Sequence, residues 1–163
     1  MTRTDLGNAA TTMYADGDEL VIERVFAAPR ELVWAMMTAP EHVPHWWGPH
    51  GTTTDVLEMD VWPGGAWRWV NKFPGGEAPF RGEYVEVQQY ERLVRTSVFD
   101  VAPANSGPAA LETVTFEDLG ATTKVVYHTR FPSPEVLSYA LAQGMTKGAL
   151  EQFDRLAGLL AAA

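Results

Sequence analysis

The sequence predicts an α+β protein in which a curved antiparallel sheet of about seven strands wraps around one long C-terminal helix. Two observations lead to this fold class. Six short β-branched or aromatic runs follow one another between residues 52 and 131, with turn-forming residues between them, as is typical of an antiparallel meander. Apolar residues then recur at helical spacing almost to the last residue, and such a long apolar stripe needs a sheet to cover it.

Composition and charge exclude several functional classes. The 163 residues include 46% apolar and 20% charged residues, as in an ordinary globular protein with one core. A net charge of −9 would repel a phosphate backbone, so nucleic acid is not an expected partner. The absence of cysteine excludes a disulfide scaffold, a thiol nucleophile and Cys-ligated metal. Because the N-terminus is polar and no long apolar run occurs, we expect a cytoplasmic protein without membrane insertion.

The N-terminal third is expected to contain a strand and one or two short helices. Residues 1–16 show no sustained periodicity and are predicted to form a flexible leader, with a strand end near Met13 and Tyr14; residues 17–163 form a single domain. The β-branched run over 18–26 predicts a strand. A helix then begins at Pro29, which suits a first helical position, and ends before Pro40. A second short helical turn is expected over 40–47.

The remaining chain is predicted to form the meander and the long helix. Pro-Gly and similar turn formers delimit the expected strands, which are 52–59, 66–73, 80–88, 92–101, 111–118 and 121–131. Ser133 and Pro134 predict a capped helix start, after which one helix continues to near the C-terminus. Glycine is unfavourable inside a helix, so Gly144 and Gly148 predict either close packing on the sheet, which we favour, or space for a ligand.

Alternation orients two strands, and a straight helix on a curved sheet predicts a cavity between them. In the strand over 66–73 the apolar-rich face carries Trp67 and Trp69, and the opposite face carries Arg68 and Lys72. In the last strand Tyr127 shares the inward face, opposite the charged residues. All six tryptophans lie between Trp34 and Trp69. The predicted cavity therefore has aromatic walls.

An ordered set of motifs resembles the activator-of-Hsp90-ATPase-homologue branch of the SRPBCC, START or Bet v 1-like superfamily. The motifs span about residues 18 to 160 and are Phe26-Ala-Ala-Pro-Arg-Glu-Leu-Val-Trp34, the stretch from Thr38 that closes with Trp46-Trp47-Gly48-Pro49, Asp60-Val-Trp-Pro-Gly-Gly-Ala-Trp-Arg-Trp69, Arg81-Gly-Glu-Tyr84, Glu91-Arg-Leu-Val94, Thr115-Phe-Glu-Asp118, Gly144-Met145 and Asp154-Arg-Leu-Ala157. The resemblance implies a helix-grip fold with a hydrophobic cavity, which other members of the superfamily use for lipids, hormones or polyketides. The namesake co-chaperone carries an additional N-terminal domain for which this sequence has no room, so Hsp90 is not an expected partner.

The candidate ligand-binding side chains combine this resemblance with the predicted inward faces. They are Trp47, Trp67, Trp69, Tyr84, Phe99, Tyr127, Met145 and Phe153. Core packing is the alternative role for each tryptophan. We expect it for Trp34 and Trp62, whereas Trp47, Trp67 and Trp69 suit a pocket equally well.

No catalytic or metal-ligating residues are predicted. Three histidines, His42, His45 and His50, lie close together, but their spacing lacks the i+4 ligand of a zinc-protease helix. A buried ionisable group would allow cyclase-type acid-base chemistry. The strand residues in question are Glu23, Arg24, Glu58, Glu86, Arg95 and Glu112, for which we favour pairing at the surface.

The sequence thus favours a protein that binds a hydrophobic small molecule, lipid-, polyketide- or natural-product-like, between the sheet and the C-terminal helix, with no cofactor. A binding role is favoured over an enzyme. The alternatives are a polyketide cyclase or aromatase, a modulator of an Hsp90-type chaperone, and a sequestration or resistance protein for a reactive natural product. A homodimer stays open, because an exposed sheet edge would allow one.

Overall fold

A computed structural model describes residues 3–163, which contain nine strands and three α-helices. The strands are β1 (Thr4–Asp5), β2 (Thr12–Asp16), β3 (Glu19–Phe26), β4 (Thr53–Met59), β5 (Ala66–Phe73), β6 (Gly76–Gln88), β7 (Arg92–Phe99), β8 (Ala110–Asp118) and β9 (Thr123–Arg130). The helices are α1 (Arg30–Thr38), α2 (Pro134–Ala142) and α3 (Met145–Ala162), with short 3-10 turns η1 (Val43–His45) and η2 (Ala104–Ser106).

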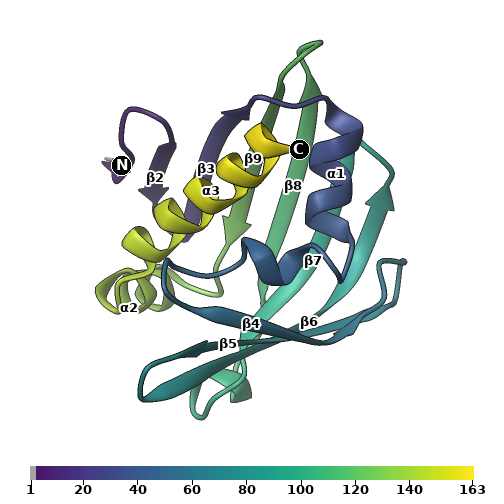
Figure 1. The fold of residues 1–163 in the computed structure, drawn as a ribbon. Coiled ribbons are helices and arrows are strands. Elements are labelled where there is room, and N and C mark those ends of the chain that lie inside the picture. Colours follow the sequence, from purple (N-terminus) through teal and green to yellow (C-terminus); the bar gives the residue numbers. More distant parts are fainter. Residues whose placement is uncertain (1–2) are drawn as a thin grey trace.

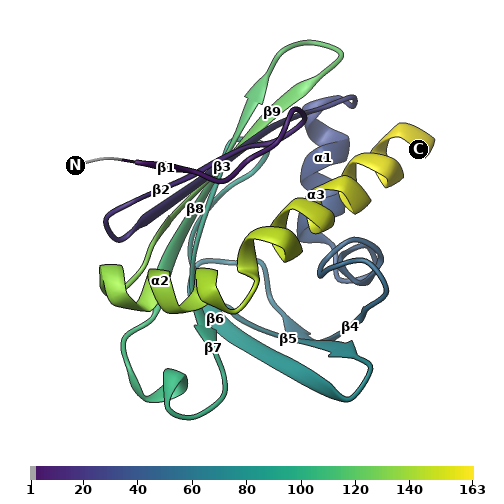
Figure 2. The same cartoon turned by 90° about the vertical axis from the view of Figure 1, so that its left-hand side faces the viewer.

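All nine strands form one antiparallel sheet in the order β1-β2-β3-β9-β8-β7-β6-β5-β4. The sheet bends strongly, so that β4 and β5 run across the lower part of the molecule while β3, β9 and β8 stand behind α3 (Figure 1). Seen from the side, α1 and α3 lie on the same concave face (Figure 2). This is the predicted α+β architecture, a curved sheet that grips a C-terminal helix.

The N-terminal segment extends the sheet beyond the expected seven strands. Residues before position 17 were expected to form a loose leader, yet Thr4–Asp5 and Thr12–Asp16 pair as strands next to β3. The strand end anticipated near Met13 and Tyr14 is the five-residue strand β2. The Met13 side chain is only 1% exposed, because it packs into the main core. Burial of this one large side chain anchors the segment on the sheet.

The predicted single C-terminal helix is divided into α2 and α3. Ser133 caps α2 as expected, since its hydroxyl accepts a hydrogen bond from the Val136 backbone N–H. Gly144 has φ +89°, a left-handed conformation that interrupts the helix and that glycine adopts readily. The expected close packing of Gly144 and Gly148 on the sheet is wrong. A Cβ atom at Gly144 would meet nothing within 4 Å, and one at Gly148 would approach Pro49 of a loop.

The core lies between the concave face of the sheet and the helices α1 and α3. Trp34 of α1 is buried and packs edge-on against Phe116 of β8, with ring centroids 5.1 Å apart. Trp46 is 1% exposed, and its indole N–H donates to the Met36 backbone oxygen. Trp62, which was expected in the core, is 69% exposed because it lies in the turn between β4 and β5. Within residues 3–163 no helix is long and apolar enough to span a membrane.

Candidate ligand-binding site

Five aromatic rings form a continuous line along the concave side of β5, β6 and β7. The ring centroids lie 4.8 Å apart for Trp67 and Trp69, 5.2 Å for Trp69 and Trp47, 5.1 Å for Trp47 and Phe80, and 5.3 Å for Phe80 and Phe99. Strand register accounts for most of this line, because Phe80 pairs with Trp69 on one side and with Phe99 on the other. We call these five residues the aromatic line. It begins at Phe99, which is 43% exposed, and ends at the buried Trp67.

Gly82 makes room for the inner end of the aromatic line. It pairs with Trp67 across β5 and β6, and the Trp67 indole passes over it to donate to the Thr96 backbone oxygen at 3.0 Å. A Cβ atom at position 82 would collide with both the Thr96 oxygen and the Trp67 Nε1 atom. The Arg81-Gly-Glu-Tyr84 motif therefore contains glycine because this close approach requires it.

The loop that carries Trp47 is fastened to α3 by hydrogen bonds between its backbone and three α3 side chains. Arg155 donates to the carbonyl oxygens of His45, Trp47, Gly48 and Pro49 at 2.9–3.3 Å. The Gly48 N–H donates to Gln152 Oε1 at 3.0 Å, and the His50 N–H donates to Glu151 Oε1 at 3.1 Å. We call these contacts between residues 45–50 and α3 the loop latch. They hold Trp47 between Trp69 and Phe80.

Gly48 fits this loop for two separate reasons. Its φ of +102° lies in the left-handed region that other residues rarely adopt. In addition, a Cβ atom there would collide with the Asn71 side chain. That side chain is buried and donates to Thr52 Oγ1, Thr54 Oγ1 and the Thr53 carbonyl oxygen. The Trp46-Trp47-Gly48-Pro49 motif is therefore packed against β5 as well as α3.

Beside the aromatic line, the concave face carries four polar side chains that we call the polar cluster: Tyr84, Arg95, Glu112 and Tyr127. Tyr84, Arg95 and Glu112 are cross-strand neighbours on β6, β7 and β8. Arg95 is 4% exposed, and its Nε and Nη2 atoms both donate to Glu112 Oε1, at 2.7 and 2.6 Å. The guanidinium also lies 5.3 Å from the Trp67 ring centroid and 5.1 Å from that of Trp69, within cation-π range.

Burial and the Glu112 charge shift the pKa values of Arg95 and of the two tyrosines. Burial opposes the charge on Arg95, but the Glu112 carboxylate outweighs this effect and the pKa of Arg95 lies above its ordinary value. Burial also raises the pKa of Tyr84 and of Tyr127, although the Arg95 charge opposes both shifts. Both tyrosines are therefore neutral hydrogen-bond donors at physiological pH.

The structure brings together seven of the eight predicted ligand-binding residues. Trp47, Trp67 and Trp69 belong to the aromatic line, Tyr84 and Tyr127 belong to the polar cluster, and Phe153 of α3 packs on Tyr127 with ring centroids 5.1 Å apart. Phe99 forms the exposed end of the same aromatic line. Met145 lies apart from this group, at the first position of α3, where it is partly buried against the core.

Sequence reasoning missed Phe80 and misplaced the Arg95–Glu112 pair. We favoured surface pairing for the ionisable strand residues, and for Arg95 that is wrong, because Arg95 is 4% exposed and its guanidinium lies within cation-π distance of two indole rings. The order of apolar and polar residues along β7 does not show which of its faces is inward, because Leu93 and Val94, on opposite faces, are both buried. The pair can be recognised only once the register between β7 and β8 is known, because that register places Arg95 opposite Glu112.

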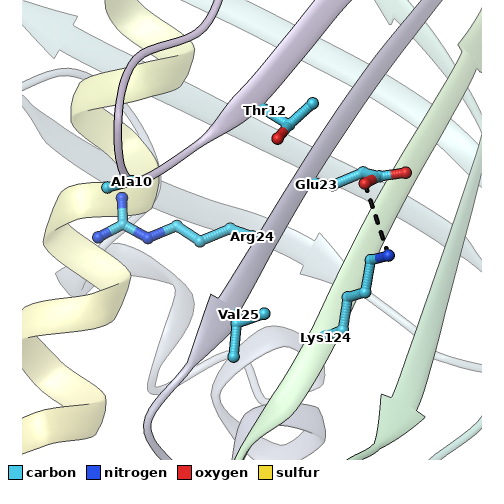
Figure 3. Close-up of a pocket in the computed structure, with 6 residues that line it drawn as sticks. All are labelled: Ala10, Thr12, Glu23, Arg24, Val25 and Lys124. Carbon is cyan, nitrogen blue, oxygen red and sulfur yellow. Dashed lines mark ion pairs between the residues drawn. The ribbon is translucent and has the colours of Figure 1, made fainter.

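Two hollows on the outer surface involve none of the eight predicted residues. The first has a volume of about 270 Å³ and is lined by Ala10, Thr12, Glu23, Arg24, Val25 and Lys124 (Figure 3). There Glu23 pairs with Lys124 at 3.6 Å, while Arg24 reaches Asp154 of α3. The second, of about 420 Å³, is lined by Trp34, Thr38, Val61, Trp62, Pro63, Val87 and Gln89.

Metal-binding geometry does not occur among residues 3–163, where no three His, Asp or Glu side chains gather as a metal site requires. Two of the neighbouring histidines, His45 and His50, are exposed, and His42 is half-buried. His128 on β9 lies at the surface and pairs with Glu19 at 3.5 Å. The candidate chemistry is therefore that of the aromatic line and the polar cluster.

Comparison with known proteins supports the fold described above. The family model described as "Activator of Hsp90 ATPase homolog 1-like protein" matches residues 27–161. A crystal structure of protein Ms6760 from Mycobacterium smegmatis superposes with a TM-score of 0.81 at 24% identity, covering 91% of this chain and 98% of that one. A solution structure of a protein from Arthrobacter aurescens gives a TM-score of 0.83 at 21% identity, covering 93% and 91%.

A third similar structure belongs to a longer protein. DynU16, a putative protein in the dynemicin biosynthetic locus, gives a TM-score of 0.69 at 23% identity. The match covers 90% of this chain and 48% of DynU16, so the chain spans about half of that protein's length. No curated protein matches the sequence.

Proposed function

Because the chain belongs to the activator of Hsp90 ATPase homolog 1-like family, within the SRPBCC or Bet v 1-like superfamily, we propose that it binds a hydrophobic small molecule between the concave face of the sheet and α3. The observation that carries this proposal is the aromatic line. It runs without interruption from the 43% exposed Phe99 to Trp67, which is 2% exposed. Tilted and edge-on rings with one accessible end offer a planar apolar ligand both a route and a binding surface.

The ligand enters by displacing Trp47. This side chain is half-buried and lies edge-on to Trp69 and Phe80, so it occupies the middle of the aromatic line. It belongs to a loop, which moves at lower cost than a strand. The loop latch opposes that movement, because Arg155 holds four carbonyl oxygens of the loop. Ligand exchange is therefore expected to depend on the latch.

An enzyme of cyclase type receives less support from the same residues. Acid-base chemistry by one carboxylate needs a group that is free to exchange a proton with the ligand. Glu112 is the carboxylate of the polar cluster, and two nitrogen atoms of Arg95 already bind its Oε1 atom. A binding role uses this pair as it stands, whereas general acid or base catalysis would have to use the remaining Oε2 atom of the paired carboxylate.

Titration with N-phenyl-1-naphthylamine, a neutral aromatic dye whose emission rises in apolar surroundings, tests the proposal. The protein should bind the dye, and Phe99→Ala should weaken binding about threefold to tenfold, because the outer ring of the aromatic line is lost. Trp62→Ala is the matched control, since Trp62 is also exposed but lines the surface hollow near α1. Absence of dye binding would overturn the proposal, and so would loss of binding in Trp62→Ala alone.

A further inference from the structure

Three buried polar atoms in and beside the polar cluster have no hydrogen-bond partner among residues 3–163. They are Trp69 Nε1, Tyr84 OH and Tyr127 OH. Folded proteins satisfy most buried donors, and each exception needs an explanation. The neighbouring indoles show that this fold satisfies such groups elsewhere, because Trp67 donates to the Thr96 oxygen and Trp46 donates to the Met36 oxygen.

The three atoms belong to one region of the concave face. Tyr84 is the direct cross-strand neighbour of Arg95, and the Trp69 ring centroid lies 5.1 Å from the Arg95 Cζ atom. Tyr127 is diagonal to Glu112, because Glu112 pairs with Thr129 two residues along the same strand. Tyr84 is 1% exposed and Tyr127 is 5% exposed, so both residues are buried. The three unused donors belong to β5, β6 and β9, and the Arg95–Glu112 pair on β7 and β8 lies between those strands in the sheet.

We propose that the polar cluster and Trp69 bind an uncharged oxygen acceptor, a ring carbonyl or a phenolic oxygen, on an aromatic ligand whose rings lie along the aromatic line. The inference rests on the proposed function and names the chemical class of its ligand. The indole N–H can only donate, and burial keeps both tyrosine hydroxyls protonated, so an acceptor matches all three groups.

Charge argues for an uncharged acceptor over a carboxylate. Glu112 already neutralises Arg95 through two short hydrogen bonds, at 2.7 and 2.6 Å. A ligand carboxylate here would add a second buried anion without a second cation, which is costly in a site of low polarity. A carbonyl or phenolic oxygen carries no net charge and still accepts hydrogen bonds from the free donors.

Two naphthalenes of equal shape test this inference. 2-Acetylnaphthalene carries a carbonyl oxygen, and 2-isopropenylnaphthalene replaces that oxygen by a CH₂ group. Both compete against N-phenyl-1-naphthylamine for the protein. We expect the ketone to bind about tenfold more tightly than the alkene. Tyr84→Phe and Tyr127→Phe should each reduce that ratio about threefold or more without changing the alkene affinity, whereas Tyr139→Phe, on the exposed face of α2, should leave it at the wild-type value.

Thermal unfolding without ligand gives a second readout. If the two hydroxyls serve a ligand, they stabilise nothing in the free protein, so Tyr84→Phe and Tyr127→Phe should keep or raise Tm. A fall in Tm for both variants would assign the hydroxyls to the fold and overturn the inference. Equal binding of ketone and alkene would also overturn it while leaving the hydrophobic site in place. Failure of both naphthalenes to bind would instead refute the proposed function.

Discussion

Replacement of Glu112 by Gln tests whether the Arg95–Glu112 pair is a buried ion pair. The variant keeps the shape of the side chain but leaves the Arg95 charge, 4% exposed, without its counterion. Removal of one partner of a buried pair costs about 3–5 kcal/mol, and we expect about 3 kcal/mol because the Glu112 side chain is 18% exposed to water. For a domain of this size such a loss lowers Tm by roughly 6–12 °C.

Urea unfolding followed by tryptophan fluorescence and circular dichroism measures the effect. The double variant Arg95→Met with Glu112→Leu removes both charges and should recover most of the lost stability. Glu58→Gln is the control for an exposed pair, since Glu58 and Arg68 are each about half exposed and 4.0 Å apart, and it should leave the midpoint unchanged. If Glu112→Gln unfolds at the wild-type urea midpoint, or if the double variant is as unstable as the single one, Arg95 does not depend on Glu112 as its buried counterion.

Three further predictions concern the loop and the tyrosines. Gly48→Ala should destabilise the protein by about 1–3 kcal/mol more than Gly75→Ala, because both glycines have positive φ but only Gly48 approaches another side chain; equal losses in urea unfolding would contradict this. Arg155→Lys should cost about 1–2 kcal/mol and speed amide exchange in residues 45–50; unchanged exchange would exclude the loop latch. Because burial raises the pKa of Tyr84 and Tyr127, both should stay protonated above pH 10 and stability should fall as pH rises further; absorbance at 295 nm that shows all five tyrosines ionising near pH 10 in the folded state would contradict this.

The parts of the fold that sequence reasoning found are those set by local chemistry. Turn formers delimited the strand over Ala66–Phe73 to the residue, and Ser133 with Pro134 placed the start of α2. Alternation also oriented Trp67 and Trp69 correctly, because β5 carries charged residues on its other face. When a strand has one polar and one apolar face, only one orientation of the strand buries its apolar side chains.

The parts that it missed depend on contacts between distant segments. The break at Gly144 was invisible because the apolar spacing continues across it, and only the backbone conformation separates the two helices. The strand at Thr12–Asp16 gains its stability from pairing with β3, which local propensity does not report. Arg95 and Glu112 are 17 residues apart, and only sheet register makes them neighbours.

Binding of an apolar ligand between the sheet and α3 can be followed at the site itself through the indole N–H resonances of the six tryptophans in ¹⁵N-labelled protein. On titration with 2-acetylnaphthalene, we expect the signals of Trp47 and Trp69 to shift most, the Trp69 N–H signal to move towards hydrogen-bonded values, and the signal of exposed Trp62 to stay unchanged. Shifts confined to Trp62 and Trp34, which line the surface hollow, would place the ligand outside the site between the sheet and α3, and six unchanged signals at saturating ligand would exclude binding at that site.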